Sequence, residues 1–216
     1  MKLWRASCAA IAFLIAASSF TLSAGGCLPG GGPDTQESSA EENGRLAEEL
    51  SEHIEYVRNN APQLASLIHG YINGERRKHG LRDLQWDQQL AQIAYTHSKD
   101  MSERDYFDHV SPEGEDFSAR YRKNGYKLQT RVGDQVYVGG ENLFLNNVAA
   151  SYTYDQVSGE ILAYEYNDLE KLARSTVDGW MDSPGHRENI LTPFSREGIG
   201  IFVNGEGEVY ITENFS

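Results

Sequence analysis

Apolar residues recur at helical spacing in several stretches of the chain. They define one buried face over about 62–80 and a second stripe over about 88–103. Shorter stretches over about 117–124 and 168–181 have the same character, and the last contains Trp180, which we expect in the core. Spacings of three and four residues place apolar side chains on one side of a helix, where they pack together. His97 lies on the second stripe, so we expect it to be a packed, hydrogen-bonded core histidine.

The C-terminal part of the chain has a different pattern. Residues 198–203 and 209–215 resemble strands, and Asn204-Gly205-Glu206-Gly207 between them predicts a hairpin turn. A further extended stretch over about 136–144 contains the Gly139-Gly140 break. Helices around a small antiparallel sheet define the α+β class, and we expect one domain over residues 61–216. A Tyr-rich insert over about 147–167 is predicted as a loop or an extra hairpin, with a binding rim as the alternative.

The first 60 residues divide into three parts. Residues 1–26 carry a short basic start, an apolar run and small residues, as an export signal does. Cys27 follows directly, which resembles the lipid-attachment site of prokaryotic lipoproteins, although Ala24 stands where Leu is favoured. Residues 27–43 are rich in Gly, Pro, Ser and acids and predict a flexible tether. Residues 44–60 predict a narrow amphipathic helix that packs on the domain or recruits a partner helix.

Composition limits the partners and the covalent chemistry. The 216-residue chain has a formal net charge of -13 and no run of Lys or Arg, which argues against nucleic acid as a partner. Its two cysteines, Cys8 and Cys27, both lie in the N-terminal segment. The folded part therefore has no disulfide, and its stability must come from the packed core.

Three segments carry candidate chemistry. They are Tyr106-Phe107-Asp108-His109-Val110-Ser111-Pro112, Gly140-Glu141-Asn142-Leu143 and Trp180-Met181-Asp182-Ser183-Pro184-Gly185-His186. A Ser-Pro step near each histidine predicts a helix cap that fixes its position. Gly140 lets the backbone turn tightly before Glu141.

These segments, in this order, resemble the CAP superfamily of cysteine-rich secretory proteins, antigen 5 and plant pathogenesis-related 1 proteins. The likeness is greatest to the disulfide-free prokaryotic branch and covers about 67–215. Three other stretches fit as well: Asn73-Gly74-Glu75-Arg76-Arg77, Leu84-Gln85-Trp86-Asp87 and Gly198-Ile199-Gly200. The resemblance implies an α–β–α sandwich with a large surface cleft that contains His109, Glu141 and His186.

The resemblance also implies an incomplete site. Animal members have two His and two Glu in the cleft, and the position of the fourth group is Ser183 here. Asp182 can substitute only if the loop is shifted. Two histidines and a carboxylate can hold zinc or another divalent cation, with His109 and His186 as ligands. The two histidines are far apart in the chain, so this site depends on the implied fold.

Several functions stay open at this point. The first is an extracellular or cell-surface module that binds an apolar, glycan or cell-envelope ligand and is attached to the membrane through its N-terminus. The second is a metal-dependent peptidase or esterase, in which Glu141 is the general base and Ser183 a weaker candidate nucleophile. The third is an envelope attachment protein. A purely structural role is the alternative for the site residues, since buried polar groups often hold loops together.

Overall fold

The central sheet joins strands from distant parts of the chain. The computed structural model describes residues 34–127, 130–132 and 134–216. The sheet has the order β1-β7-β8-β4, formed by β1 (Gln85–Trp86), β7 (Arg196–Val203), β8 (Glu208–Phe215) and β4 (Gly140–Asn147). Strand β1 runs parallel to β7, whereas β7 and β4 are both antiparallel to β8. The predicted C-terminal hairpin is confirmed, and it forms the middle of the sheet.

Helix α3 (Gln88–Glu103) covers one face of this sheet at very short range. A Cβ atom on Gly200 would lie 1.8 Å from the Tyr95 backbone nitrogen, and one on Gly198 would lie 2.1 Å from that of Ala91. Only glycine leaves room for this approach. The two glycines of the Gly198-Ile199-Gly200 stretch therefore bring the helix and the strand together.

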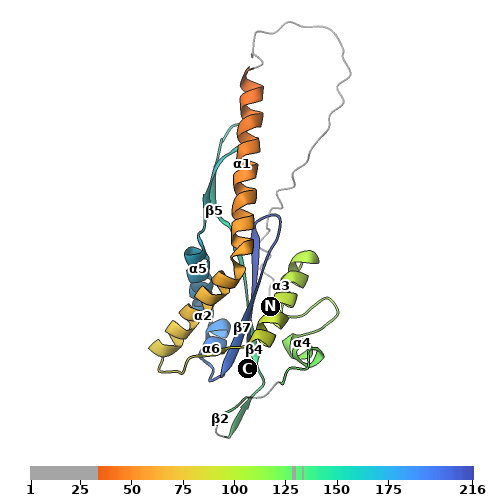
Figure 1. Ribbon diagram of the computed structural model, residues 1–216, viewed down its shortest axis with the longest axis vertical. Coiled ribbons are helices and arrows are strands. Elements are labelled where there is room, and N and C mark those ends of the chain that lie inside the picture. The colour runs from red at the N-terminus through yellow and green to blue at the C-terminus, as the bar shows by residue number, and fades with distance from the viewer. Residues whose placement is uncertain (1–33, 128–129, 133) are drawn as a thin grey trace.

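Three helices form the layer on the opposite face. They are α2 (Ala61–Lys78), α5 (Leu169–Asp182) and α6 (Pro184–Leu191), so the α+β class and the α–β–α order are confirmed (Figure 1). The largest fully buried side chain is that of Trp180, whose indole N–H donates to the Leu143 carbonyl at 2.9 Å. The core between this layer and the sheet is aliphatic and aromatic, as the periodicity predicts.

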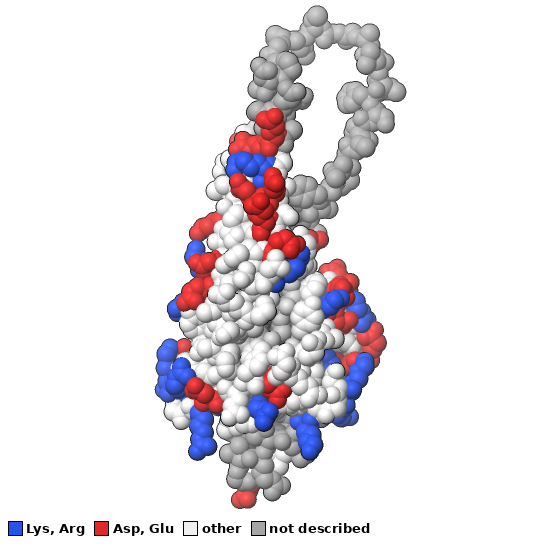
Figure 2. All heavy atoms as spheres, in the orientation of Figure 1, with Lys and Arg blue, Asp and Glu red and all other residues white. Residues whose placement is uncertain are grey.

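The long helix α1 (Asp34–Asn59) packs on the domain through the narrow apolar face predicted for it. Leu46, Ile54 and Val57 are at most 5% exposed. This face therefore already has a partner within the chain. The helix begins inside the segment predicted as a flexible tether, so that prediction is wrong for residues 34–43. Acidic side chains gather along the part of α1 that extends past the body of the domain (Figure 2).

The Tyr-rich insert is a two-stranded hairpin. Strands β5 (Ala149–Tyr154) and β6 (Ile161–Tyr166) pair with each other alone and lie beside α1. A second short hairpin consists of β2 (Thr130–Val132) and β3 (Gln135–Tyr137). Within the described residues, no helix is both long and apolar enough to cross a membrane. The expected export signal and Cys27 lie outside the described residues.

The two Ser-Pro steps do not act as predicted. Ser183 and Pro184 do begin α6, but the Ser183 side chain makes no capping hydrogen bond. Ser111 and Pro112 precede a turn instead of a helix, closed by the Gly114 N–H on the Ser111 carbonyl at 2.8 Å. In each case the turn geometry positions the chain without the expected side-chain bond.

Candidate functional site

The three residues singled out by the motifs lie at the β4 edge of the sheet. Glu141 is the second residue of β4, His109 belongs to the loop before α4 (Phe117–Lys123), and His186 lies in the first turn of α6. The His109 Nδ1 atom is 3.0 Å from Glu141 Oε1. The ring centroids of His109 and His186 are 6.4 Å apart. The fold thus brings together three groups that are widely separated in the chain.

Glu141 is buried and held by an arginine. Arg120 Nη2 donates to both carboxylate oxygens, at 2.8 and 2.7 Å, and also to the His109 carbonyl at 3.0 Å. The Arg120 side chain is 9% exposed and that of Glu141 is 1% exposed, so water screens this pair little. Arg120 therefore compensates the buried carboxylate and fixes the backbone of the loop that carries His109.

This arrangement orients the His109 ring. An Nδ1–H that donates to the carboxylate leaves Nε2 as the free position of the neutral imidazole. The His109 side chain is 48% exposed. The carboxylate therefore holds the ring through Nδ1, while about half of the side chain remains exposed to solvent. Carboxylates commonly orient metal-binding histidines in the same way.

Side-chain amides attach α6 to the same strand. Asn142 Nδ2 donates to the His186 carbonyl at 3.3 Å, and Asn189 Nδ2 donates to the Glu141 carbonyl at 3.1 Å. A Cβ atom on Gly140 would lie 3.0 Å from Asn189 Oδ1, so this glycine makes room for α6. The tight turn itself lies one residue earlier, because Gly139 has a φ of 89°. Burial, and next the neighbouring His109, lower the pKa of His186.

Two residues proposed from the third motif, Asp182 and Ser183, are not bonded to the cluster in the described part of the chain. Asp182 is the last residue of α5 and is exposed. Within the described part of the chain, neither the Asp182 carboxylate nor the Ser183 hydroxyl makes a hydrogen bond to His109, Glu141 or His186. The position of the missing fourth carboxylate is therefore not filled by Asp182.

Two further residues belong to the cluster, and the motifs did not point to them. His97 is 2% exposed, as its place on the apolar stripe predicts, and its Nε2 is 3.9 Å from Glu141 Oε1. Burial is the main cause that lowers the pKa of His97. Arg120 lies beside the buried Tyr121 on α4. A cation next to a core aromatic on a short helix is the only sequence signal that could have indicated it.

The donor set is a weak one for a metal ion. The described residues contain no group of three or more His, Cys, Asp or Glu placed to hold a cation. The Glu141 carboxylate is already hydrogen-bonded to Arg120 and His109. The imidazoles of His109 and His186 are therefore the groups available to bind a metal ion. Two imidazoles need water or a bound molecule to complete a tetrahedral site.

The α–β–α sandwich, with a buried carboxylate bonded to His109 and a second histidine nearby at one edge of its sheet, defines the class of small domains to which this chain is similar. The chain belongs to the cysteine-rich secretory protein family, CAP, whose model matches residues 69–215. The family resemblance read from the motifs is thereby confirmed.

Two relatives come from Bacillus subtilis (strain 168). The chain is 33% identical to the uncharacterized membrane protein YlbC over 141 residues, which is 65% of this chain and 30% of YlbC. It is 30% identical to the uncharacterized protein YkwD over 134 residues, which is 62% of this chain and 40% of YkwD. The match therefore spans well under half of either relative.

Solved structures also resemble the fold. An outer surface protein from Borrelia burgdorferi superposes with a TM-score of 0.52 at 16% identity, covering 71% of this chain and 91% of that protein. An extracellular protein containing a SCP domain from Bacillus anthracis str. Ames has a TM-score of 0.48 at 28% identity, covering 71% and 40% of the two chains. The first of these likenesses supports the fold alone.

Proposed function

We propose that this protein is an exported binding module whose His109–Glu141–His186 site takes a cell-envelope glycan. The observation that carries the proposal is the fixed Glu141. Because Arg120 and His109 engage its carboxylate, Glu141 orients His109 and is poorly placed to accept a proton from water. Such a site favours recognition over hydrolysis.

The chemistry around the histidines fits a sugar. The lowered pKa keeps His186 neutral at neutral pH, so its ring can exchange hydrogen bonds with hydroxyl groups. Phe107 and Val110, on the same loop as His109, are 46% and 43% exposed. Sugars combine hydroxyl groups with apolar ring faces, and an exposed aromatic side chain next to polar groups suits both. An apolar ligand would use Phe107 and Val110 but not the imidazoles.

Export and attachment to the membrane are part of this proposal. The relatives' names include a membrane protein, an extracellular protein and an outer surface protein. The apolar N-terminal run and Cys27 support an exported chain that carries a lipid at Cys27. Mass spectrometry of the mature N-terminus tests this part, and an unmodified N-terminus away from Cys27 would contradict it.

Calorimetry with a soluble tetramer of N-acetylglucosamine tests the site. We expect binding by the full chain and at least about tenfold weaker binding by His109→Ala with His186→Ala, a loss of roughly 1.4 kcal/mol. His79→Ala is the matched control, because His79 is exposed at the end of α2 and should leave binding unchanged. Equal affinity in the double variant and the control would refute the proposal.

The metal-dependent hydrolase is the second candidate, favoured by the 6.4 Å separation of the two imidazole rings. His109 and His186 would hold the cation, which would polarise a bound water. Calorimetric titration with zinc, at neutral pH and again at about pH 5, tests this candidate because imidazole ligands must be deprotonated. Zinc binding that is lost in the double variant, together with cleavage of a peptide or ester, would replace the glycan proposal.

A further inference from the structure

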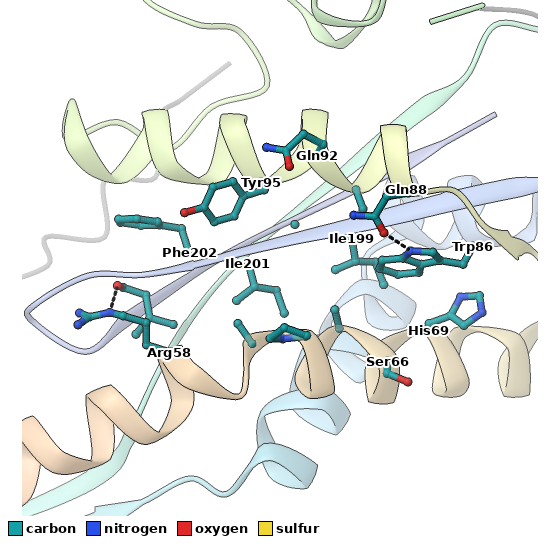
Figure 3. Close-up of a pocket in the computed structure, with 16 residues that line it drawn as sticks. Arg58, Ser66, His69, Trp86, Gln88, Gln92, Tyr95, Ile199, Ile201 and Phe202 are labelled. Carbon is teal, nitrogen blue, oxygen red and sulfur yellow. Dashed lines mark hydrogen bonds between the residues drawn. The ribbon is translucent and has the colours of Figure 1, made fainter. Parts of the chain in front are cut away.

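A large hollow lies at the other edge of the sheet. It has a volume of about 720 Å³ and is lined by α2, α3 and the outer edge of β7, with Arg58 of α1 and Trp86 of β1 (Figure 3). In sheet order this edge is two strands away from β4, which carries Glu141. The hollow therefore shares no lining residue with the histidine site. We call it the β7 groove.

The floor of the β7 groove is an unpaired strand edge. Arg196 and Ser216 exchange both backbone hydrogen bonds, and the Asn204 N–H donates to the Glu208 carbonyl. In an antiparallel pair such bonds occur at every second residue, so Ile199 and Ile201 direct their backbone groups away from β8. These groups point towards the groove.

Protein groups close the two ends of this edge but not its middle. The Asp87 N–H donates to the Glu197 carbonyl at 2.7 Å, and Arg58 Nε donates to the Val203 carbonyl at 3.2 Å. Strand β1 pairs with β7 only at Arg196 and Glu197. Among the described residues, no group pairs with the outward N–H and C=O of Ile199 and Ile201, although both residues are at most 5% exposed.

The walls leave space for a chain along this edge. Ala and Ser residues of α2 and α3 line them together with longer side chains such as Gln88 and Gln92. Aromatic side chains stand at both ends, Trp86 at one and Tyr95 with Phe202 at the other (Figure 3). The lining residues include no Asp or Glu, although the whole chain has 32 acids and a net charge of -13. The face between α2 and α3 is largely uncharged in Figure 2. The lining does include one cation, Arg58, so the groove is a part of this acidic protein whose own side chains do not repel an acidic ligand.

We propose that the β7 groove binds an extended peptide segment of another protein, neutral or acidic in charge, as an added strand along Ile199–Ile201. A strand supplies the N–H and C=O groups that the edge requires and places alternate side chains against the apolar walls. At about 3.3 Å per residue, the interval from Glu197 to Val203 accommodates about five residues. An acyl chain would pack against the walls but would leave the backbone N–H and C=O groups of Ile199 and Ile201 unpaired, at a cost in free energy.

The probe is the peptide acetyl-Asp-Val-Thr-Val-Thr-Val-amide, with two N-methylated forms, one modified on the valines and one on the threonines. Successive amides of a strand point to opposite sides, so only one form loses the bonds to β7. We expect that form to bind the full chain at least about tenfold more weakly than the parent. The other form should bind like the parent, and the amides of Ile199 and Ile201 should exchange with deuterium more slowly when the parent binds.

Two variants locate the site. Ile201→Pro removes one outward N–H and no bond to β8, since proline is tolerated at strand edges. Ala61→Trp narrows the groove from α2, and Gln63→Trp is its control because Gln63 is exposed and outside the lining. Both groove variants should lose peptide binding, whereas Gln63→Trp and His109→Ala should keep it. If Ile201→Pro unfolds, Ala61→Trp decides.

Three results would overturn the proposal. One is equal binding by the parent peptide and both N-methylated forms. Another is absence of measurable peptide binding while sodium laurate binds the groove, which would assign it to an acyl chain. The third is peptide binding that persists in Ala61→Trp. Because His109→Ala is measured alongside, failure here is distinguishable from failure of the glycan proposal.

Discussion

Removing the Arg120 guanidinium should be the most damaging single change at the histidine site. In Arg120→Ala the Glu141 carboxylate stays buried at 1% exposure and loses the donor that serves both of its oxygens. The His109 and Glu115 carbonyls lose their bonds to the same side chain, at 3.0 and 2.8 Å. The variant therefore leaves an uncompensated buried charge and frees the loop between α3 and α4.

The magnitude follows from the burial of both partners. Breaking a buried ion pair on one side costs about 3–5 kcal/mol, because the remaining charge has no substitute for water. For a domain of this size, each kcal/mol shifts the unfolding midpoint by about 2–4 °C. We therefore expect a midpoint lower by roughly 6–20 °C. Arg122→Ala on the same helix is the control, since Arg122 is exposed and should change the free energy of unfolding by about 0.5 kcal/mol at most.

Urea and thermal unfolding followed by circular dichroism provide the test. In the double variant Arg120→Ala with Glu141→Gln, the buried negative charge is gone, and we expect recovery of about 1 kcal/mol or more relative to Arg120→Ala alone. The reasoning would be refuted if Arg120→Ala were as stable as Arg122→Ala. Strict additivity in the double variant would also refute it, since it would mean that the two side chains do not interact.

The remaining predictions concern two histidines and a glycine. Burial lowers the pKa of His97 in the folded state, so the neutral histidine contributes its full share of the folding stability above about pH 6.5. This stability is lost as the pH falls from there towards the folded-state pKa. In urea unfolding, His97→Gln should therefore lose less stability than the parent protein between about pH 7 and 5. The hydrogen bond to Glu197 raises the pKa of His69 in the folded state. The contribution of His69 to folding stability is therefore complete below about pH 6.5 and is lost as the pH rises through the folded-state pKa. His69→Gln should reduce the free energy of unfolding more at about pH 5.5 than at about pH 8.5. Gly200→Ala should destabilise by about 3 kcal/mol or more or prevent folding, whereas Gly205→Ala, with nothing within 4 Å, should change the unfolding midpoint little.

Local patterns predicted the elements well because each depends on nearby residues. The stripe over 88–103 gives α3, and the two strand-like stretches on either side of the turn at Asn204 give β7 and β8. The tether prediction failed at α1 because its N-terminal part is acidic and apolar-poor, so composition indicated a solvated chain where the structure continues the helix. The Ser-Pro prediction failed for a related reason. It assumed a side-chain hydrogen bond, whereas α6 begins with Pro184 in its first turn and without that bond.

The sequence by itself determined the class of the fold, its family and the three motif residues His109, Glu141 and His186. The fold class follows from the periodicity within each segment, whereas the family and the three site residues follow from the resemblance that the ordered motifs carry. The tertiary structure decided which groups contact Glu141, because the position of Arg120 relative to β4 depends on how α4 packs in the fold. It also decided that the stretch Ile199–Ile201 of β7 has outward backbone groups without a partner among the described residues, since strand order and hydrogen-bond direction are properties of the assembled sheet. The cluster expected from the motifs is thus a histidine site oriented by a buried ion pair, and the β7 groove is a feature that no local pattern predicts.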